Sequence, residues 1–156
     1  MATEIERKFL VSEDTWRPGA RGCRYIQGYL SRDPGRIVRV RQAGSSAYLT
    51  IKGGAQGTAR PEFEYPIPLP DAEGLMKLCL RPLIDKTRYL VEHHGKRWEV
   101  DEFHGENEGL VLAEIELSRE EESIDLPSWI GKEVSLDPRY FNAYLSEHPY
   151  TQWKSK

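Results

Sequence analysis

Cysteine is scarce in this sequence: its 156 residues include only Cys23 and Cys79, which form neither a CxxC motif nor a cluster with histidine. A structural zinc site built on thiolates is therefore not expected, and nothing requires an oxidising compartment. No apolar run approaches the roughly 18 residues that cross a bilayer. Charges from Glu4 onward replace the apolar core of a secretory signal. We therefore expect a cytoplasmic protein without a membrane partner.

An excess of basic residues is absent as well. Lysine and arginine number 22 against 25 acidic residues, so the formal net charge is −3 and no nucleic-acid surface is predicted. The glycine-rich stretch at 53–58 lacks the GxxxxGKS/T spacing of a phosphate-binding P-loop. The length fits one domain over residues 1–156, and a homodimer is left open. No metal-ligand spacing links the four histidines, which we interpret as surface residues: His93, His94, His104 and His148.

What the sequence does have is many charged residues, 30% of the chain, in segments that alternate between polar and apolar. In the segment 4–11, Glu4, Glu6 and Lys8 would share one face of a strand, with Ile5 and Phe9 on the other. Taken alone, this alternation also fits an ordinary half-buried sheet whose charges face water. The same pattern predicts further strands over 24–30, 36–42, 47–52, 60–68, 84–92, 96–103 and 110–118.

Other segments predict helices. The first would span 71–80 with Asp71 as its N-cap, and its apolar side would comprise Leu75, Leu78 and Cys79. The C-terminal region of about 119–148 lacks the strand pattern. Within it, 126–134 is interpreted as a short helix and 138–145 as the last helix. Disorder is the interpretation of the tail, residues 149–156.

The charges on the predicted strands are sorted by sign. Surface ion pairs contribute only about 0–1 kcal/mol each, so exposed charges have little reason to be sorted. Eight strands can close into a barrel whose interior holds one small ligand. We therefore predict a mainly β (α+β) fold, a closed eight-stranded antiparallel barrel or tunnel with a charged interior and a few helices packed outside. The pairs two residues apart are acidic at Glu4/Glu6, Glu62/Glu64, Glu99/Asp101 and Glu114/Glu116, and basic at Arg39/Arg41 and Lys86/Arg88.

In their order, these motifs resemble those of one family. The N-terminal EIERKFLV is similar to the ExExK signature of the CYTH superfamily, the triphosphate tunnel metalloenzymes. The resemblance continues through RVR at 39–41, LTIK ending at Lys52, RPEFE at 60–64, KTR at 86–88, EVDEF at 99–103, EIE at 114–116, and SWIGKEV followed by Arg139, Tyr140 and Asn142. It covers nearly the whole chain and is greatest for the compact bacterial inorganic triphosphatases.

The resemblance implies metal-dependent hydrolysis of inorganic triphosphate to diphosphate and phosphate, with Mg²⁺ or Mn²⁺ as cofactor. Metal ligands would be Glu6, Glu114 and Glu116, with Glu4 at a second ion or at the attacking water and Asp101 at a second ion. Glu62 and Glu64 would orient basic side chains. The resemblance assigns phosphate binding to Lys8, Arg39, Arg41, Lys52, Arg60, Lys86, Arg88 and Arg139.

The resemblance also implies that Lys8 and Tyr29 together act as the general base, as in some compact members of the family. A base of this kind predicts an alkaline activity optimum. Pro138 and Ala143 stand where the family often has basic residues, so one or two phosphate contacts are in doubt. Two alternatives stay open. One is an enzyme acting on an organic triphosphate: thiamine triphosphatase, nucleoside triphosphatase or class IV adenylyl cyclase. The other is a polyphosphate-binding module without hydrolytic activity.

Overall fold

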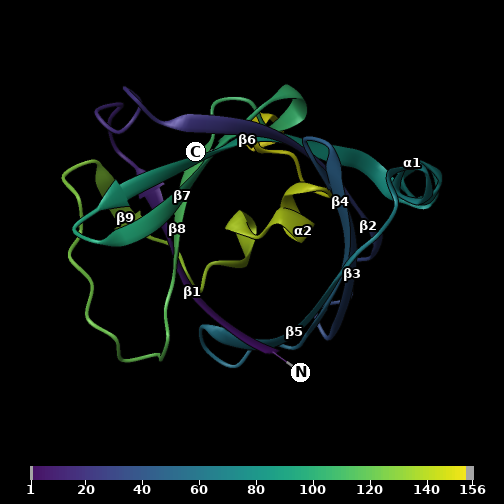
Figure 1. The fold of residues 1–156 in the computed structure, drawn as a ribbon, viewed down its shortest axis with the longest axis horizontal. Coiled ribbons are helices and arrows are strands. Elements are labelled where there is room, and N and C mark those ends of the chain that lie inside the picture. Colours follow the sequence, from purple (N-terminus) through teal and green to yellow (C-terminus); the bar gives the residue numbers. More distant parts are fainter. Residues whose placement is uncertain (1, 154–156) are drawn as a thin grey trace.

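A computed structural model of the chain describes residues 2–153, and most of them belong to antiparallel β-strands (Figure 1). Each predicted strand is present, although several begin earlier than the alternation indicates. The eight strands are β1 (Ala2–Val11), β2 (Arg21–Ser31), β3 (Arg36–Ala43), β4 (Ser46–Gly53), β5 (Ala59–Pro66), β6 (Leu80–His93), β7 (Lys96–Phe103) and β8 (Val111–Glu116).

The sheet closes on itself through β1. In the order β5-β4-β3-β2-β6-β7-β8-β1, each strand pairs with the next, and β1 pairs in turn with β5. Every pairing is antiparallel, and the ring of strands is visible in Figure 1. The predicted closed eight-stranded barrel is therefore confirmed. Because closed barrels have no free edge, all eight strands find partners on both sides.

A ninth strand replaces the helix predicted over 126–134, and that prediction is wrong. Strand β9 (Ile130–Glu133) pairs with the end of β1 on the edge opposite β8, beyond the point where β5 stops. Val134 N donates to Lys8 O at 2.8 Å, and Ser12 N donates to Trp129 O at 2.9 Å. Backbone groups of β1 that β5 leaves unpaired are satisfied in this way, which a helix could not do.

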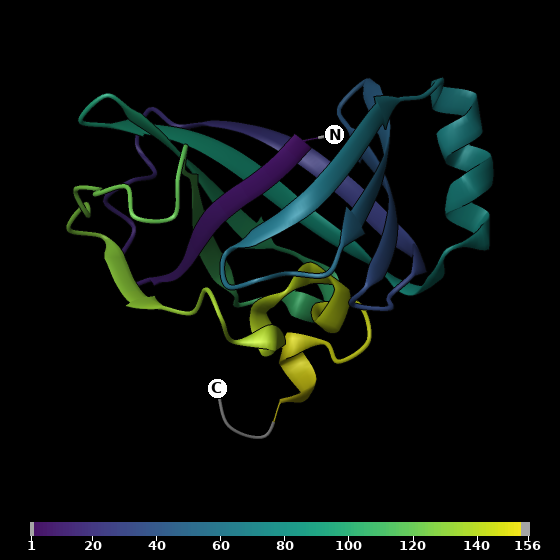
Figure 2. The ribbon, with the colours of Figure 1, turned by 90° about the horizontal axis from the view of Figure 1, so that it is seen from below.

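Helix α1 (Leu69–Leu78) begins and ends two residues before the predicted bounds, with Pro68 and not Asp71 at the N-cap. It lies outside the barrel wall, as Figures 1 and 2 show, and packs Ala72 against Val40 and Ala47 of β3 and β4. Leu78, which was predicted to pack, is 71% exposed. The packing face is therefore turned toward Ala72, where a small side chain lets the helix approach the sheet closely.

The segment from Pro138 onward closes one end of the barrel and does not cover its side (Figure 2). The helix predicted over 138–145 is split into a 3₁₀ turn (Pro138–Tyr140) and α2 (Asn142–Leu145) by the extended backbone of Phe141. Of the tail, a further 3₁₀ turn (Tyr150–Gln152) and Trp153 are ordered against Tyr140 and Tyr144. Disorder is thus the wrong prediction for 149–153, and 154–156 lie outside the described residues.

Apolar side chains gather on the outer face of the strands, where loops and helices cover them. The largest fully buried side chains, Trp98 and Phe9, pack with Trp129 and Trp16 from the two long loops that flank β1 and β8. A second cluster, which includes Tyr29, Ile84 and Leu112, lies on the inner face of the strands at the closed end of the barrel, beneath the C-terminal turns. The remainder of the barrel interior is left to polar groups. Within residues 2–153, no helix combines the length and the apolar character that a membrane span requires.

Candidate active site

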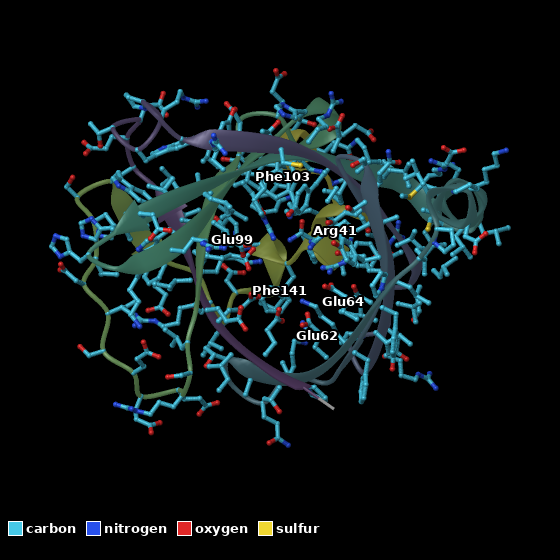
Figure 3. All side chains as sticks on the ribbon, viewed as in Figure 1. Arg41, Glu62, Glu64, Glu99, Phe103 and Phe141 are labelled. Atoms are coloured by element: carbon cyan, nitrogen blue, oxygen red, sulfur yellow. The ribbon has the colours of Figure 1, made fainter. Side chains whose placement is uncertain are left out.

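The interior of the barrel contains a cavity of about 360 Å³ that is lined mainly by charged side chains. Phe141, Asn142 and Ala143 line it at the end that the C-terminal region closes. In Figure 3, Arg41, Glu62, Glu64 and Glu99 project from their strands toward this space. Thirteen charged residues contribute to the lining: Glu4, Glu6, Lys8, Arg39, Arg41, Lys52, Arg60, Glu62, Glu64, Arg88, Glu99, Glu114 and Glu116.

Four carboxylates meet where β1 pairs with β8. Glu6 lies directly opposite Glu116, and Lys8 lies opposite Glu114, so the i, i+2 pairs of the two strands share one face. Burial raises the pKa of Glu6 well above its usual range, and the carboxylates of Glu114 and Glu4 raise it further. Among the described residues, neither Glu6 nor Glu116 has a salt bridge to a basic side chain.

This carboxylate cluster, Glu4, Glu6, Glu114 and Glu116, fits a hard divalent cation. Carboxylate oxygens are the ligands that Mg²⁺ and Mn²⁺ prefer, and the cluster offers no nitrogen or sulfur donor. A bound cation would offset the repulsion from neighbouring carboxylates that contributes to the raised pKa of Glu6. Glu4 differs from the other three because its carboxylate also accepts a hydrogen bond from Lys52 Nζ at 2.9 Å.

Glu114 connects the acidic and basic sides of the cavity. Its Oε1 lies 3.9 Å from Lys8 Nζ and 3.9 Å from Arg88 Nη2. Burial would raise the pKa of Glu114, but the attraction of Lys8 and Arg88 outweighs this effect and holds the pKa well below its usual range. The pKa values of these two neighbouring carboxyls are therefore shifted in opposite directions.

The basic side of the cavity holds more positive charge than its carboxylates neutralise. Arg39 Nη2 contacts Thr50 Oγ1 at 3.2 Å and Glu64 Oε2 at 3.5 Å, yet its buried Nε has no hydrogen-bond partner. Arg41 has no carboxylate within salt-bridge distance among the described residues. Burial, together with Arg39 and Arg88, lowers the pKa of Arg41 to about 9, so it is still charged at neutral pH. Unpaired guanidinium groups of this kind favour binding of an anion with several oxygens.

Lys86 and Asp101 lie behind this surface and do not line the cavity. Asp101, 1% exposed, accepts from Lys86 Nζ at 2.7 Å and from Arg88 Nε at 2.8 Å. Burial lowers the pKa of Lys86 to about 7, although Asp101 opposes the shift. Asp101 thus contacts the basic side chains of Lys86 and Arg88, whereas the resemblance assigned it to a second metal ion.

The remaining basic residues divide between the cavity and the surface. Lys52 lies between Glu4 and Glu62, 3.6 Å from the latter carboxylate. The Arg60 guanidinium lines the cavity and donates to Gly53 O. The structure does not bring Arg139 to the cavity: its side chain is 51% exposed, and it pairs with Asp137 at 2.7 Å.

Lys8 and Tyr29 both line the cavity but are held by different partners. Lys8 Nζ donates to Tyr140 O at 3.0 Å and lies 5.5 Å from the ring centroid of Phe141. The Tyr29 hydroxyl accepts from Gln27 Nε2 at 3.2 Å. In the part of the chain that the structure describes, Lys8 Nζ and the Tyr29 hydroxyl therefore do not hydrogen-bond to each other.

Gln27 is a site residue that the sequence analysis missed. Its side chain is fully buried, and its Oε1 accepts from Arg41 Nε at 2.8 Å. Its Nε2 donates to Tyr29 and, at 3.3 Å, to Asn142 Oδ1, which also accepts from Lys86 Nζ at 3.0 Å. One amide thus fixes Arg41 relative to the C-terminal region. The signal that could have found it is its place between Tyr25 and Tyr29 on the polar face of β2.

Comparison with known proteins matches this arrangement of strands and charges to one family. The CYTH domain profile matches residues 2–141. The chain belongs to the CYTH domain family. This CYTH domain is 48% identical over 155 residues to an inorganic triphosphatase of Acetivibrio thermocellus, and the alignment covers 99% of each chain. It is also 36% identical over 149 residues to an inorganic triphosphatase of Nitrosomonas europaea, covering 92% of this chain and 97% of the relative.

Solved structures share the architecture of this CYTH domain. A crystal structure described as that of an inorganic triphosphatase superposes with a TM-score of 0.68 at 33% identity, covering 94% of this chain and 95% of the other. The ring of strands is therefore shared with a solved relative and is not peculiar to this sequence.

Proposed function

We propose that this CYTH domain hydrolyses inorganic triphosphate to diphosphate and phosphate. The observation that carries the proposal is the cavity itself, in which a carboxylate cluster faces Arg41, which has no acidic partner among the described residues, and Arg39, whose buried Nε has no hydrogen-bond partner. A small polyanion with a divalent cation would neutralise both surfaces at once. The relatives that are named inorganic triphosphatases, at 48% and 36% identity, support the same conclusion.

The cofactor in this proposal is Mg²⁺ or Mn²⁺. Glu6, Glu114 and Glu116 would hold it, with Glu4 available to a second ion or to a water. When bound, such an ion supplies charge neutralisation at the phosphate oxygens. Asp101 is not included, because both of its oxygens already accept from Lys86 and Arg88.

The chain's own residues would position the triphosphate and remove a proton. Arg39, Arg41 and Arg88 can each present two N–H groups to phosphate oxygens, which fixes the terminal phosphorus in place. Water attacks that phosphorus, the bond to the bridging oxygen breaks, and diphosphate leaves. The proton that water loses would pass to Lys8 and Tyr29 acting together, which is consistent with their positions on the cavity wall.

The role of Tyr29 predicts a change in the pH dependence of the reaction. Wild type should have an alkaline optimum, because a base that includes the phenol and the amine works best where it can give up its proton. Tyr29→Phe keeps the ring that packs near Ile84 but removes the hydroxyl. We expect kcat to fall by about 10²-fold and the rise of activity toward alkaline pH, which reports deprotonation of the base, to change shape. Identical pH–rate profiles for the two proteins would exclude Tyr29 from the base.

The substrate itself is tested by phosphate release from inorganic triphosphate, ATP and thiamine triphosphate, each with Mg²⁺ or Mn²⁺. We expect inorganic triphosphate to have the highest kcat/KM by at least about tenfold, since the cavity wall offers charges for phosphate. A higher value for ATP or thiamine triphosphate would reassign the enzyme to organic triphosphates. Binding of triphosphate without release from any substrate would identify a binding module instead.

A further inference from the structure

A second group of metal-ligating side chains lies outside the barrel, at the turn between β6 and β7. His93 and His94 come from this turn, and Asp125 comes from the loop between β8 and β9. One ligand atom from each residue lies within 4.8 Å of the other two. His93 Nε2 is 3.6 Å from Asp125 Oδ2, and His94 Nδ1 contacts the same oxygen. This His93–His94–Asp125 cluster contains no residue of the cavity.

The donor types of the three residues, two imidazole nitrogens and one carboxylate oxygen, suit a four-coordinate transition metal. Zinc binds imidazole nitrogen and carboxylate oxygen at about 2.0–2.2 Å, so its ligand atoms lie about 3.3 Å from one another. The 3.6 Å between His93 Nε2 and Asp125 Oδ2 is close to that value. Two imidazoles and one carboxylate leave the fourth position to water, and the exposed sides of His94 and Asp125 allow an ion to enter.

An ordinary ion pair explains the cluster less well. A single imidazolium would satisfy Asp125, but here two rings stack at 4.0 Å with only 10° between their planes, facing one carboxylate. Two imidazolium rings at this distance would repel each other. Two neutral rings that share a cation with the carboxylate would not, because metal binding uses the deprotonated imidazole.

The backbone of the turn does not require histidine at position 94. His94 and Gly95 both have positive φ, 48° and 78°, as the two-residue hairpin turn demands. Asparagine or glycine is the preferred residue at the first position of such a turn. Metal binding by the imidazole ring therefore explains the presence of His94 better than the backbone conformation of the turn does.

We propose that His93, His94 and Asp125 form a site for a zinc-class divalent ion that fastens the β8–β9 loop to the β6–β7 turn. An ion pair between Lys96 and Glu122 joins the same two segments, and Glu122 also accepts from Ser118 N. The loop in question leads from Glu116 to β9, which pairs with β1 beside Lys8. By holding this loop, the ion would stabilise β9 and its pairing with β1, without contacting any residue that lines the cavity.

Zinc titration of the full-length protein tests the site, with Mg²⁺ in excess so that the carboxylate cluster is occupied by a hard ion. Histidine-selective NMR would report which ring nitrogens respond, and calorimetry would give the affinity. His94→Asn keeps a residue that tolerates positive φ, and Asp125→Asn removes only the charge. We expect each to weaken zinc binding by at least about tenfold, as loss of a ligand should. Triphosphatase activity should be unchanged in both.

The matched control is His148→Asn, since His148 also lies beside one carboxylate, Glu147, at 3.7 Å but has no second histidine. It should leave zinc affinity at the wild-type value. Equal zinc affinity in wild type, His94→Asn and Asp125→Asn would overturn the proposal. So would zinc binding that is lost in Glu114→Gln but kept in His94→Asn, because the ion would then belong to the cavity. Neither result depends on which triphosphate is the substrate.

Discussion

Glu114→Gln is expected to lower kcat for triphosphate hydrolysis by about a thousandfold, or about 4 kcal/mol of transition-state stabilisation. The substitution keeps the shape of a side chain that is only 9% exposed but removes its charge. The divalent ion then loses a ligand, while Lys8 and Arg88 keep their positive charges. Because the cavity becomes more positive, KM for triphosphate should not rise in proportion. Steady-state kinetics over a range of Mg²⁺ concentrations would separate the two effects.

The control for this variant is Glu102→Gln on the neighbouring strand β7. Glu102 also forms an ion pair, with Arg17 at 3.1 Å, but it does not line the cavity. Its activity should stay within about twofold of wild type, as for surface substitutions distant from a site. Activity of Glu114→Gln within tenfold of wild type, in a protein that circular dichroism shows to be folded, would remove Glu114 from the metal site.

Asp101→Asn is expected to destabilise the fold by about 3–5 kcal/mol, because it leaves Lys86 and Arg88 buried without their common carboxylate. Lys86 is fully buried and Arg88 is 8% exposed, so water cannot replace the lost charge. The free energy of unfolding from urea titrations measures the loss. Asp85→Asn is the control, since Asp85 pairs with Arg24 at the barrel surface. Its stability should stay close to that of wild type.

The acid dependence of stability gives a second test of the same contact. Burial would raise the pKa of Asp101, but Arg88 and Lys86 outweigh it and lower the pKa below its usual range. An acid whose pKa is lower in the folded state stabilises the protein above the unfolded pKa of about 3.9. That stabilisation is lost as pH falls below this value. Wild type should therefore lose stability more steeply than Asp101→Asn below about pH 4. Parallel curves would show that Asp101 does not carry the effect.

The fold could be predicted because the strands of this barrel are marked twice, by alternation and by the sign of their charges. Glu4/Glu6 and Glu114/Glu116 predicted that β1 and β8 present carboxylates to one surface, and the register places Glu6 opposite Glu116. Periodicity could not predict β9. Its four residues become a strand only because β1 extends past the end of β5, a property of a partner that is about 120 residues away.

The depth of each charge was also beyond the sequence. Lys86 and Arg88 lie two residues apart on the same face of β6, yet only Arg88 reaches the cavity while Lys86 is enclosed by Asp101 and Asn142. An i, i+2 pattern gives the face of a strand but not the distance to the closed end of a barrel. Arg139 was misplaced for a related reason. The extended backbone at Phe141 ends the preceding turn, and the guanidinium is left at the surface with Asp137.

The seam at β1 has a consequence for how the protein folds. This strand hydrogen-bonds with β5, β8 and β9, so each of its neighbours is synthesised after it. Glu6 and Glu116 must be brought together across most of the chain before either faces the other. Pairings this distant in sequence slow folding, because loop entropy is lost before any contact is gained. A nascent chain therefore has to keep its first strand from aggregating until translation has passed β8, and the charges at Glu4, Glu6 and Lys8 help by opposing association with other strands.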